Sequence, residues 1–205
     1  PIPHAFDMRT TQLIFAGPEQ ALMAVAMTQM GRFYGLPVYI NVGLTDSKVP
    51  DAQAGMEAGI TLTCGALAGA DIFGHLGISG VDQAASPEML VLQHEIVSYV
   101  ERLMRGFEVN DETLGLDVIR RVGHDGNFLG EMHTVRHFRN ELWFPTLLDR
   151  DYWATWIEEG ATTMRERCVE RVRSLLDSHE PVPLDRETAR EVNGVLERAK
   201  RALTS

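Results

Sequence analysis

Three short polar stretches carry the residue types best suited to chemistry. The first runs from Asn41 to Lys48 and follows the apolar run VYINV, so that one loop holds an amide, hydroxyls, a carboxylate and an amine. If Asp46 and Lys48 point into a shared opening, they can act together on a polar substrate, because loops carry function more often than the elements they connect. The alternative is a solvated turn in which Asp46 caps the following helix and Lys48 faces water.

The second stretch is HLGISGVDQ, residues 75–83, which follows the apolar run ADIFG. His75 ends this run, and Asp82 and Gln83 follow a glycine-rich turn. A histidine at the end of a strand can serve as an acid or a base, or can orient a substrate. The surrounding glycines would let a ligand approach closely. The alternative is a core histidine that is satisfied by a neighbouring backbone group.

The third stretch is GEMHTVRHFR, in which Glu131, His133 and His137 have the spacing E-x-H-x-x-x-H. Two histidines four residues apart share one face of a helix and can bind a metal ion. The order differs from the HExxH motif of zinc proteases. A structural role is therefore the preferred interpretation, and no tightly bound metal is expected.

The same stretch contains two arginines, Arg136 and Arg139, whose planar guanidinium groups can hold a substrate carboxylate through paired hydrogen bonds. The alternative is that they pair with the neighbouring carboxylates of Glu131 and Glu141. The spacing leaves both roles open.

Alternating strands and helices are predicted to position these stretches. Strands are expected over residues 12–16, 38–42 and 70–77, where short apolar runs are rich in β-branched and aromatic residues. One helix is expected to begin at Pro18 and another after the N-cap Asp51. The strand–helix repeat is about 30–35 residues, which is the size of a βαβ unit. We therefore expect a parallel sheet with right-handed crossovers.

The rest of the chain is predicted to be mainly helical. Long helices are expected after the N-caps Ser86, Asp151 and Asp185. A shorter helix is expected over residues 111–122, and a fourth strand near residues 127–129. The sequence EPVP, residues 180–183, predicts a linker before the last helix.

An aromatic stripe marks the helix expected after Asp151. Trp153, Trp156 and Met164 recur at helical spacing, and the stripe continues to Leu175. Aromatic side chains can form a cage for a quaternary ammonium group. The helical spacing favours core packing instead.

The fold class is predicted to be α/β. No GxGxxG motif follows the first strand and no P-loop is present, so a nucleotide-binding Rossmann fold is not supported. A closed barrel has eight strands and typically about 250 residues, which is more than this chain offers. We therefore expect the C-terminal part of a (β/α)8 TIM-type barrel, with parallel strands and additional C-terminal helices. Residues 1–150 would form the half-barrel, and residues 151–205 a helical extension packed on it.

Composition argues against several classes of protein. The 205 residues carry a net charge of −10, and such a surface repels the phosphate backbone of a nucleic acid. No apolar run approaches the roughly 20 residues that a membrane span needs, and no signal peptide is visible. Membrane association is therefore not expected. Cys64 and Cys168 lie far apart without CxxC spacing, which is typical of reduced thiols in a cytoplasmic protein.

Three blocks of sequence occur in a characteristic order. They are MGRFYGLPVYINVGLTDSKVPDAQAGMEAG, ADIFGHLGISGVDQAASPEMLVLQHEIVSYVERLMRGFEVNDETLGLDVI and FLGEMHTVRHFRNELWFPTLLDR. Over roughly residues 10–155 they resemble the trimethylamine methyltransferase family. The resemblance implies a (β/α)8 barrel of well over twice this length, of which this chain would be the C-terminal half.

The resemblance also implies a reaction. Members of the family transfer a methyl group from a methylated amine to the cobalt of a corrinoid (cobalamin) carried by a cognate partner protein. Members that demethylate trimethylamine contain pyrrolysine, whereas many relatives lack it and use quaternary amines such as glycine betaine. The segment TDSK, with Lys48, lies near the position expected for that residue. A true lysine there favours a quaternary amine, whose methyl group is already activated by the positive charge on nitrogen.

Roles for the polar stretches follow from the resemblance. Lys48, His75 and Asp82 would form the catalytic set, and the carboxylates of Asp46 and Asp82 would attract the cationic nitrogen. An arginine would hold a betaine carboxylate. The expected substrate-binding residues are Asn41, Asp46, Gln83, Glu131, His133, Arg136 and Arg139.

Two other functions are kept as alternatives. Half a barrel leaves open sheet edges, so the chain could be a non-catalytic module that binds a partner or a second copy. A homo-oligomer is expected in either case. The other alternative is a metal-dependent barrel enzyme that uses His75, His133 and His137. Bound zinc would favour the metal enzyme, and methyl transfer from a betaine to cob(I)alamin would favour the methyltransferase.

Overall fold

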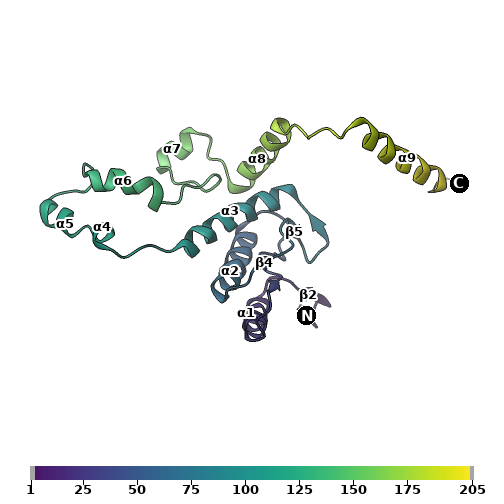
Figure 1. The fold of residues 1–205 in the computed structure, drawn as a ribbon, viewed down its shortest axis with the longest axis horizontal. Coiled ribbons are helices and arrows are strands. Elements are labelled where there is room, and N and C mark those ends of the chain that lie inside the picture. The colour runs from purple at the N-terminus through teal and green to yellow at the C-terminus, as the bar shows by residue number, and fades with distance from the viewer. Residues whose placement is uncertain (1–2, 204–205) are drawn as a thin grey trace. The chain divides into compact units, whose positions relative to one another are not determined.

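Residues 3–203 are described by a computed structural model, drawn in Figure 1. The fold is a helix-rich mixture of α and β structure, and its short strands form two-stranded sheets. Contacts divide the described chain into two units, the first ending at Val172 and the second beginning at Arg173. Within the described range, no helix is both long enough and apolar enough to cross a lipid bilayer.

The described chain begins with a β-hairpin. Strands β1 (Ala5–Asp7) and β2 (Gln12–Ile14) pair antiparallel. The strand predicted over residues 12–16 is confirmed at Gln12–Ile14, but its expected parallel pairing is wrong. The physical reason is the tight turn before β2, where the Asp7 carboxylate accepts a hydrogen bond from the Arg9 backbone N–H at 2.9 Å.

A parallel βαβ unit follows the hairpin. After α1 (Pro18–Phe33), strand β3 (Tyr39–Ile40) leads into α2 (Ala52–Ala68) and strand β4 (Ile72–Phe73). The two strands pair in parallel, with Tyr39 opposite Ile72. The predicted strand–helix–strand order and its parallel pairing are confirmed for this segment.

Helix starts in this part of the chain agree with the predicted caps. Pro18 occupies the first turn of α1. The Asp51 carboxylate accepts from the Ala54 N–H at 3.0 Å at the start of α2. The Ser86 hydroxyl accepts from the Met89 N–H at 3.2 Å at the start of α3, which spans Pro87–Arg105. Each cap satisfies a backbone donor that has no partner within its helix.

The main core lies between β3 and helices α1, α2 and α3. Gly65 lets α2 approach the strand closely, because a Cβ at this position would lie 2.6 Å from Ile40 Cδ1. The buried members of this core are Ala24, Val38, Ile40, Val42, Leu62 and Val100.

A small hairpin lies between β4 and α3. It consists of β5 (Ile78–Ser79) and β6 (Ala84–Ala85), which pair antiparallel. The sequence did not predict these strands, which are shorter than the runs that periodicity can detect. The loop after β4 is thus an ordered element rather than an open turn.

Three short helices follow α3. They are α4 (Asp111–Leu114), α5 (Leu116–Val122) and α6 (Met132–Glu141). The single helix predicted over residues 111–122 is broken at Gly115, whose φ of +57° ends α4 in the left-handed region.

The strand predicted near residues 127–129 is also wrong. The Asn127 side chain accepts from the Leu129 N–H at 3.2 Å, and the Thr134 hydroxyl donates to the Phe128 carbonyl at 2.7 Å. These local side-chain bonds hold the backbone in a turn and compete with strand pairing.

The helix predicted after Asp151 is two helices, α7 (Trp153–Glu158) and α8 (Met164–Ser178). Gly160 and Ala161 separate them with φ values of +97° and +52°. Asp151 does not cap α7 with its side chain. A left-handed glycine is a common helix terminator, and here it interrupts a continuous apolar stripe.

The prediction of core packing for the aromatic stripe holds for Met164 but not for Trp153. Met164 packs against a second buried cluster, whereas Trp153 is 75% exposed. The break at Gly160 removes Trp153 from the register of α8. The buried members of the second cluster are Ala54, Met89, Leu92, Leu147 and Cys168.

The second unit contains the end of α8 and helix α9 (Arg186–Leu203). Residues 180–183 are not helical, as predicted. The Asp185 carboxylate accepts from the Thr188 N–H at 3.0 Å, so the predicted cap of α9 is confirmed.

Candidate functional site at the strand-end loops

The loop after β3 is polar but largely buried. Asn41, Thr45 and Ser47 are each at most 5% exposed, and Asp46 is half-buried. Only Lys48 at the end of the stretch is exposed. A solvated turn is therefore the wrong description, and Asp51 rather than Asp46 caps α2. Buried polar groups need partners, and here helix α2 and neighbouring loop residues supply them.

Helix α2 provides two of these partners. The Glu57 carboxylate accepts from the Thr45 hydroxyl at 2.6 Å and from the Asp46 N–H at 2.9 Å. The Thr61 hydroxyl accepts from the Gly43 N–H at 2.9 Å. Sequence reasoning did not identify Glu57 or Thr61, although their spacing of four residues places both on one helical face.

Asp46 is a carboxylate with an unusual environment. Burial raises its pKa, the Phe15 backbone N–H that donates to it at 3.1 Å opposes this, and the nearby Glu57 carboxylate raises the pKa further. The Lys48 ammonium donates at 2.7 Å to the Asp46 backbone carbonyl, not to its carboxylate. The carboxylate of Asp46 on this loop thus lies close to that of Glu57 on α2, and such a pair favours the approach of a cation.

His75 connects the two strand ends. Its Nδ1 lies 2.9 Å from Asn41 Oδ1 and 3.2 Å from the Tyr39 hydroxyl oxygen. With hydrogen on Nδ1, His75 donates to Asn41 and keeps Nε2 for another partner. The side chain is exposed and has a φ of +72°, so it is not the core histidine of the alternative interpretation.

The hairpin after β4 folds back onto the loop after β3. The Gly80 N–H donates to the Ser47 carbonyl at 3.0 Å, and a Cβ at Gly80 would lie 3.6 Å from Lys48 Cγ. Asp82 follows in this turn, exposed and with a φ of +60°. The Lys48 side chain therefore lies beside the turn that carries Asp82.

Gln83, which follows Asp82, is also exposed. Its Nε2 lies 3.5 Å from Gln12 Oε1 on β2. This long contact links the hairpin after β4 to the N-terminal hairpin.

A fully buried glutamine on α3 holds both strand-end loops. Gln93 Nε2 donates to the Gly43 carbonyl at 2.7 Å, and the Gly77 N–H donates to Gln93 Oε1. On α1, Gln20 Nε2 similarly donates to the Asn41 carbonyl at 2.9 Å. Gln93 is a polar residue among the buried apolar positions of α3, and this placement is the sequence signal for its role.

The third polar stretch has its own set of partners. Glu131 forms an ion pair with Arg121 at 2.6 Å, and the Arg139 guanidinium lies 5.5 Å from the Phe138 ring centroid. The alternative pairing of Arg136 and Arg139 with Glu131 and Glu141 is not observed among the described residues, in which Arg121 pairs with Glu131 and Arg102 with Glu141.

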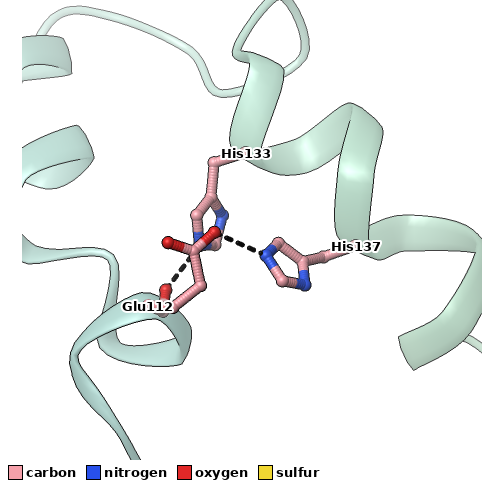
Figure 2. A group of neighbouring side chains, drawn as sticks. All are labelled: Glu112, His133 and His137. Atoms are coloured by element: carbon pink, nitrogen blue, oxygen red, sulfur yellow. Dashed lines mark hydrogen bonds and ion pairs between the residues drawn. The ribbon is translucent and has the colours of Figure 1, made fainter.

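The predicted histidine pair lies on α6, but its carboxylate partner is Glu112 rather than Glu131. His133 Nε2 lies 2.7 Å from the Glu112 backbone carbonyl, and His137 Nε2 lies 3.0 Å from Glu112 Oε1 (Figure 2). The hydrogen bond from His137 lowers the pKa of Glu112. His75 is not part of this cluster, so a single site built from His75, His133 and His137 has no support from the described residues.

Comparison with known proteins places the sequence in one family. A family profile described as trimethylamine methyltransferase (MTTB) matches residues 2–204. The trimethylamine methyltransferase MttB of Methanosarcina barkeri is 32% identical over 197 residues, which are 96% of this chain and 40% of the relative. The glycine betaine methyltransferase of Desulfitobacterium hafniense (strain Y51) is 37% identical over 182 residues, which are 88% of this chain and 38% of the relative.

The matches cover nearly all of this chain but less than half of each relative. The chain spans about 40% of the length of the curated relatives that it matches. The family profile nevertheless covers almost every residue of the chain, and relatives that act on two different amines are similar to it. The chain belongs to the trimethylamine methyltransferase family.

Proposed function

We propose that the protein containing this chain transfers a methyl group from a methylated amine to a corrinoid held by a partner protein. The observation that carries the proposal is the family match over residues 2–204. A quaternary amine such as glycine betaine is the proposed substrate. Lys48 in the TDSK segment and the 37% identity to a glycine betaine methyltransferase both favour it over trimethylamine.

We also propose that residues 1–150 belong to the C-terminal half of a (β/α)8 barrel and that residues 151–205 extend it. The parallel β3–α2–β4 unit supports this, because the polar residues follow the C-terminal ends of both strands, where barrel enzymes build their sites. Unpaired strand edges favour association, so pairing of two copies is part of the proposal. The two free cysteines fit a cytoplasmic location.

The strand-end residues would bind and orient the amine. In this proposal the Asp46 and Glu57 carboxylates stabilise the positive nitrogen, and Asp82 extends the acidic surface at the rim. Lys48 is the cation that lies on the same loop as Asp46, and it is better placed for a betaine carboxylate than Arg136 or Arg139. The His75–Asn41 contact would fix the opposite side of the opening.

The partner's corrinoid would supply the metal nucleophile that accepts the methyl group. The chain need not ligate it, and the exposure of Lys48, His75 and Asp82 fits a site that is open to a group presented from outside. As the methyl group leaves, the C–N bond electrons return to nitrogen and neutralise its charge. No proton is needed at that nitrogen, so the task of these residues is positioning.

Replacing Asp46 by Asn is expected to affect substrate binding but not to lower stability. Because the folded-state pKa of Asp46 is raised, the ionised carboxylate lowers stability at pH values above its ordinary pKa of 3.8. Asp46→Asn is expected to preserve or raise the melting temperature at pH 7, because Asn can still accept from the Phe15 N–H. The same change is expected to weaken glycine betaine binding at least about tenfold. Lower stability with unchanged affinity would assign Asp46 a structural role.

Asp82 gives a second prediction at the exposed rim. Asp82→Asn in the product of the complete gene is expected to raise the apparent dissociation constant for glycine betaine about tenfold, because it removes a negative charge near the cationic nitrogen. Calorimetric titration measures this, and Asp125→Asn is a matched control at another exposed aspartate. Equal affinity in the wild type and Asp82→Asn would remove Asp82 from the site.

Methyl transfer from glycine betaine to free cob(I)alamin tests the reaction itself. The absorbance change of the corrinoid reports the transfer. The proposal requires transfer by the product of the complete gene, and no transfer from any methylated amine would favour the binding module instead.

A further inference from the structure

A cluster of potential metal ligands lies outside the strand-end loops. Glu112 on α4 and His133 and His137 on α6 lie side by side, and each offers one potential ligand atom (Figure 2). These atoms all lie within 4.8 Å of one another. Their hydrogen bonds go to each other rather than to the loops after β3 and β4.

The local fold fixes this arrangement. His133 and His137 are four residues apart on α6, so their rings lie side by side with centroids 4.4 Å apart. On the other side, Asn110 and Thr113 form a capping box that begins α4 and sets the direction of Glu112. The left-handed Gly115 ends α4 beneath His133, where a Cβ would lie 3.6 Å from His133 Nε2.

We propose that Glu112, His133 and His137 bind a divalent transition-metal ion of the zinc class. Two imidazole nitrogens and one carboxylate oxygen suit Zn²⁺ or Co²⁺, whereas Mg²⁺ and Ca²⁺ prefer oxygen ligands alone. Ligand atoms that share a tetrahedral ion lie roughly 3.3 Å apart. The present spacing therefore requires only small movements, in which the two Nε2 atoms exchange their hydrogen bonds to Glu112 for the metal.

The ion would link helix α4 to helix α6 through their side chains. Glu112 lies 21 and 25 residues before the histidines, and the intervening chain has few buried side chains. Coordination of one ion by Glu112 and the two histidines would stabilise the folded arrangement of α4 and α6. A water molecule would complete the coordination of a three-ligand site. The site departs from the expectation that this chain binds no metal tightly, and it does not depend on the methyltransferase reaction.

Zinc titration of the metal-free 205-residue chain by calorimetry tests the site, with Co²⁺ absorption as an independent readout of tetrahedral coordination. We expect one ion per chain and a higher melting temperature with Zn²⁺ but not with Mg²⁺. His137→Ala and Glu112→Gln are each expected to weaken binding at least about tenfold. His124→Ala is the control, because His124 is an exposed histidine outside the cluster.

These variants distinguish a three-ligand metal site from metal binding by a surface histidine pair alone. Melting curves without metal show whether each variant is folded. Binding that survives in Glu112→Gln would mean that a surface histidine pair holds the ion, and it would overturn the three-ligand site. Absence of zinc binding, or equal loss in His124→Ala, would overturn it as well.

Discussion

Glu95→Leu is expected to lower the free energy of unfolding by about 3 kcal/mol or more, the largest loss that we predict for a single substitution in this chain. Glu95 is 3% exposed on α3. Its carboxylate accepts from the Thr146 N–H at 2.8 Å, the Thr146 hydroxyl at 2.6 Å, the Leu147 N–H at 2.9 Å and the Leu148 N–H at 3.2 Å. Removing the carboxylate leaves the buried Leu147 N–H and the three part-buried donors of Thr146 and Leu148 without this partner.

The same carboxylate makes stability depend on pH in a defined direction. Burial alone would raise the pKa of Glu95, but the hydrogen bonds from Thr146, Leu147 and Leu148 outweigh it and lower the pKa. The stabilisation is therefore fully present above the ordinary glutamate pKa of 4.5 and is lost as the pH falls through the lowered folded-state pKa.

Urea unfolding at several pH values measures both effects. Glu95→Gln is expected to remove this contribution to the acid dependence, and the exposed neighbour His94→Leu is the control on the same helix. A loss below about 1 kcal/mol in Glu95→Leu would show that the segment from Thr146 to Leu148 does not depend on this carboxylate.

Gln93→Leu is expected to have the second-largest effect, and to affect the site as well as stability. The change leaves the Gly43 carbonyl and the Gly77 N–H buried and unpaired, at a cost of about 2–4 kcal/mol. Because these two groups belong to the loops after β3 and β4, their relative position is no longer fixed. Methyl transfer by the product of the complete gene is expected to fall at least about tenfold.

Gln93→Glu separates the two hydrogen bonds. Its carboxylate can still accept from the Gly77 N–H, but it places an oxygen against the Gly43 carbonyl. We expect it to be folded at low temperature yet less active than wild type. Full activity in both Gln93 variants, with His94→Leu unchanged, would contradict the positioning role.

The elements that the sequence predicted well are those determined by neighbouring residues. Pro18, Asp51, Ser86 and Asp185 mark helix starts by local chemistry, and each was placed correctly. The parallel pairing of β3 and β4 followed from the order of a strand, a helix and a strand. An N-cap side chain bonds to a backbone N–H only two or three residues later, so a helix start can be predicted from the local sequence alone.

The elements that were missed depend on single residues in special conformations or on distant contacts. Gly160 breaks an apolar stripe that otherwise looks continuous, and side-chain bonds at Asn127 replace a predicted strand. Glu112 could not be chosen over Glu131 as the partner of the histidines, because the choice depends on how α4 meets α6.

In the strand-end site, too, the sequence predicted the local features but not the distant contacts. Periodicity located the loops and their polar residues, and the structure brings Asn41 and His75 into contact. Periodicity could not reveal that Glu57, Thr61 and Gln93 contact these loops from 12, 18 and 50 residues away in the sequence. Tertiary packing decides such contacts, and it also explains why a polar loop is buried rather than solvated.

The proposed activity of the protein that contains this chain is demethylation of a quaternary amine. The most direct test is the initial rate of methyl transfer to cob(I)alamin from glycine betaine, proline betaine, carnitine and trimethylamine, measured with the product of the complete gene. We predict transfer from a betaine and little or none from trimethylamine. Transfer from trimethylamine alone, or from none of the four amines, would contradict the account.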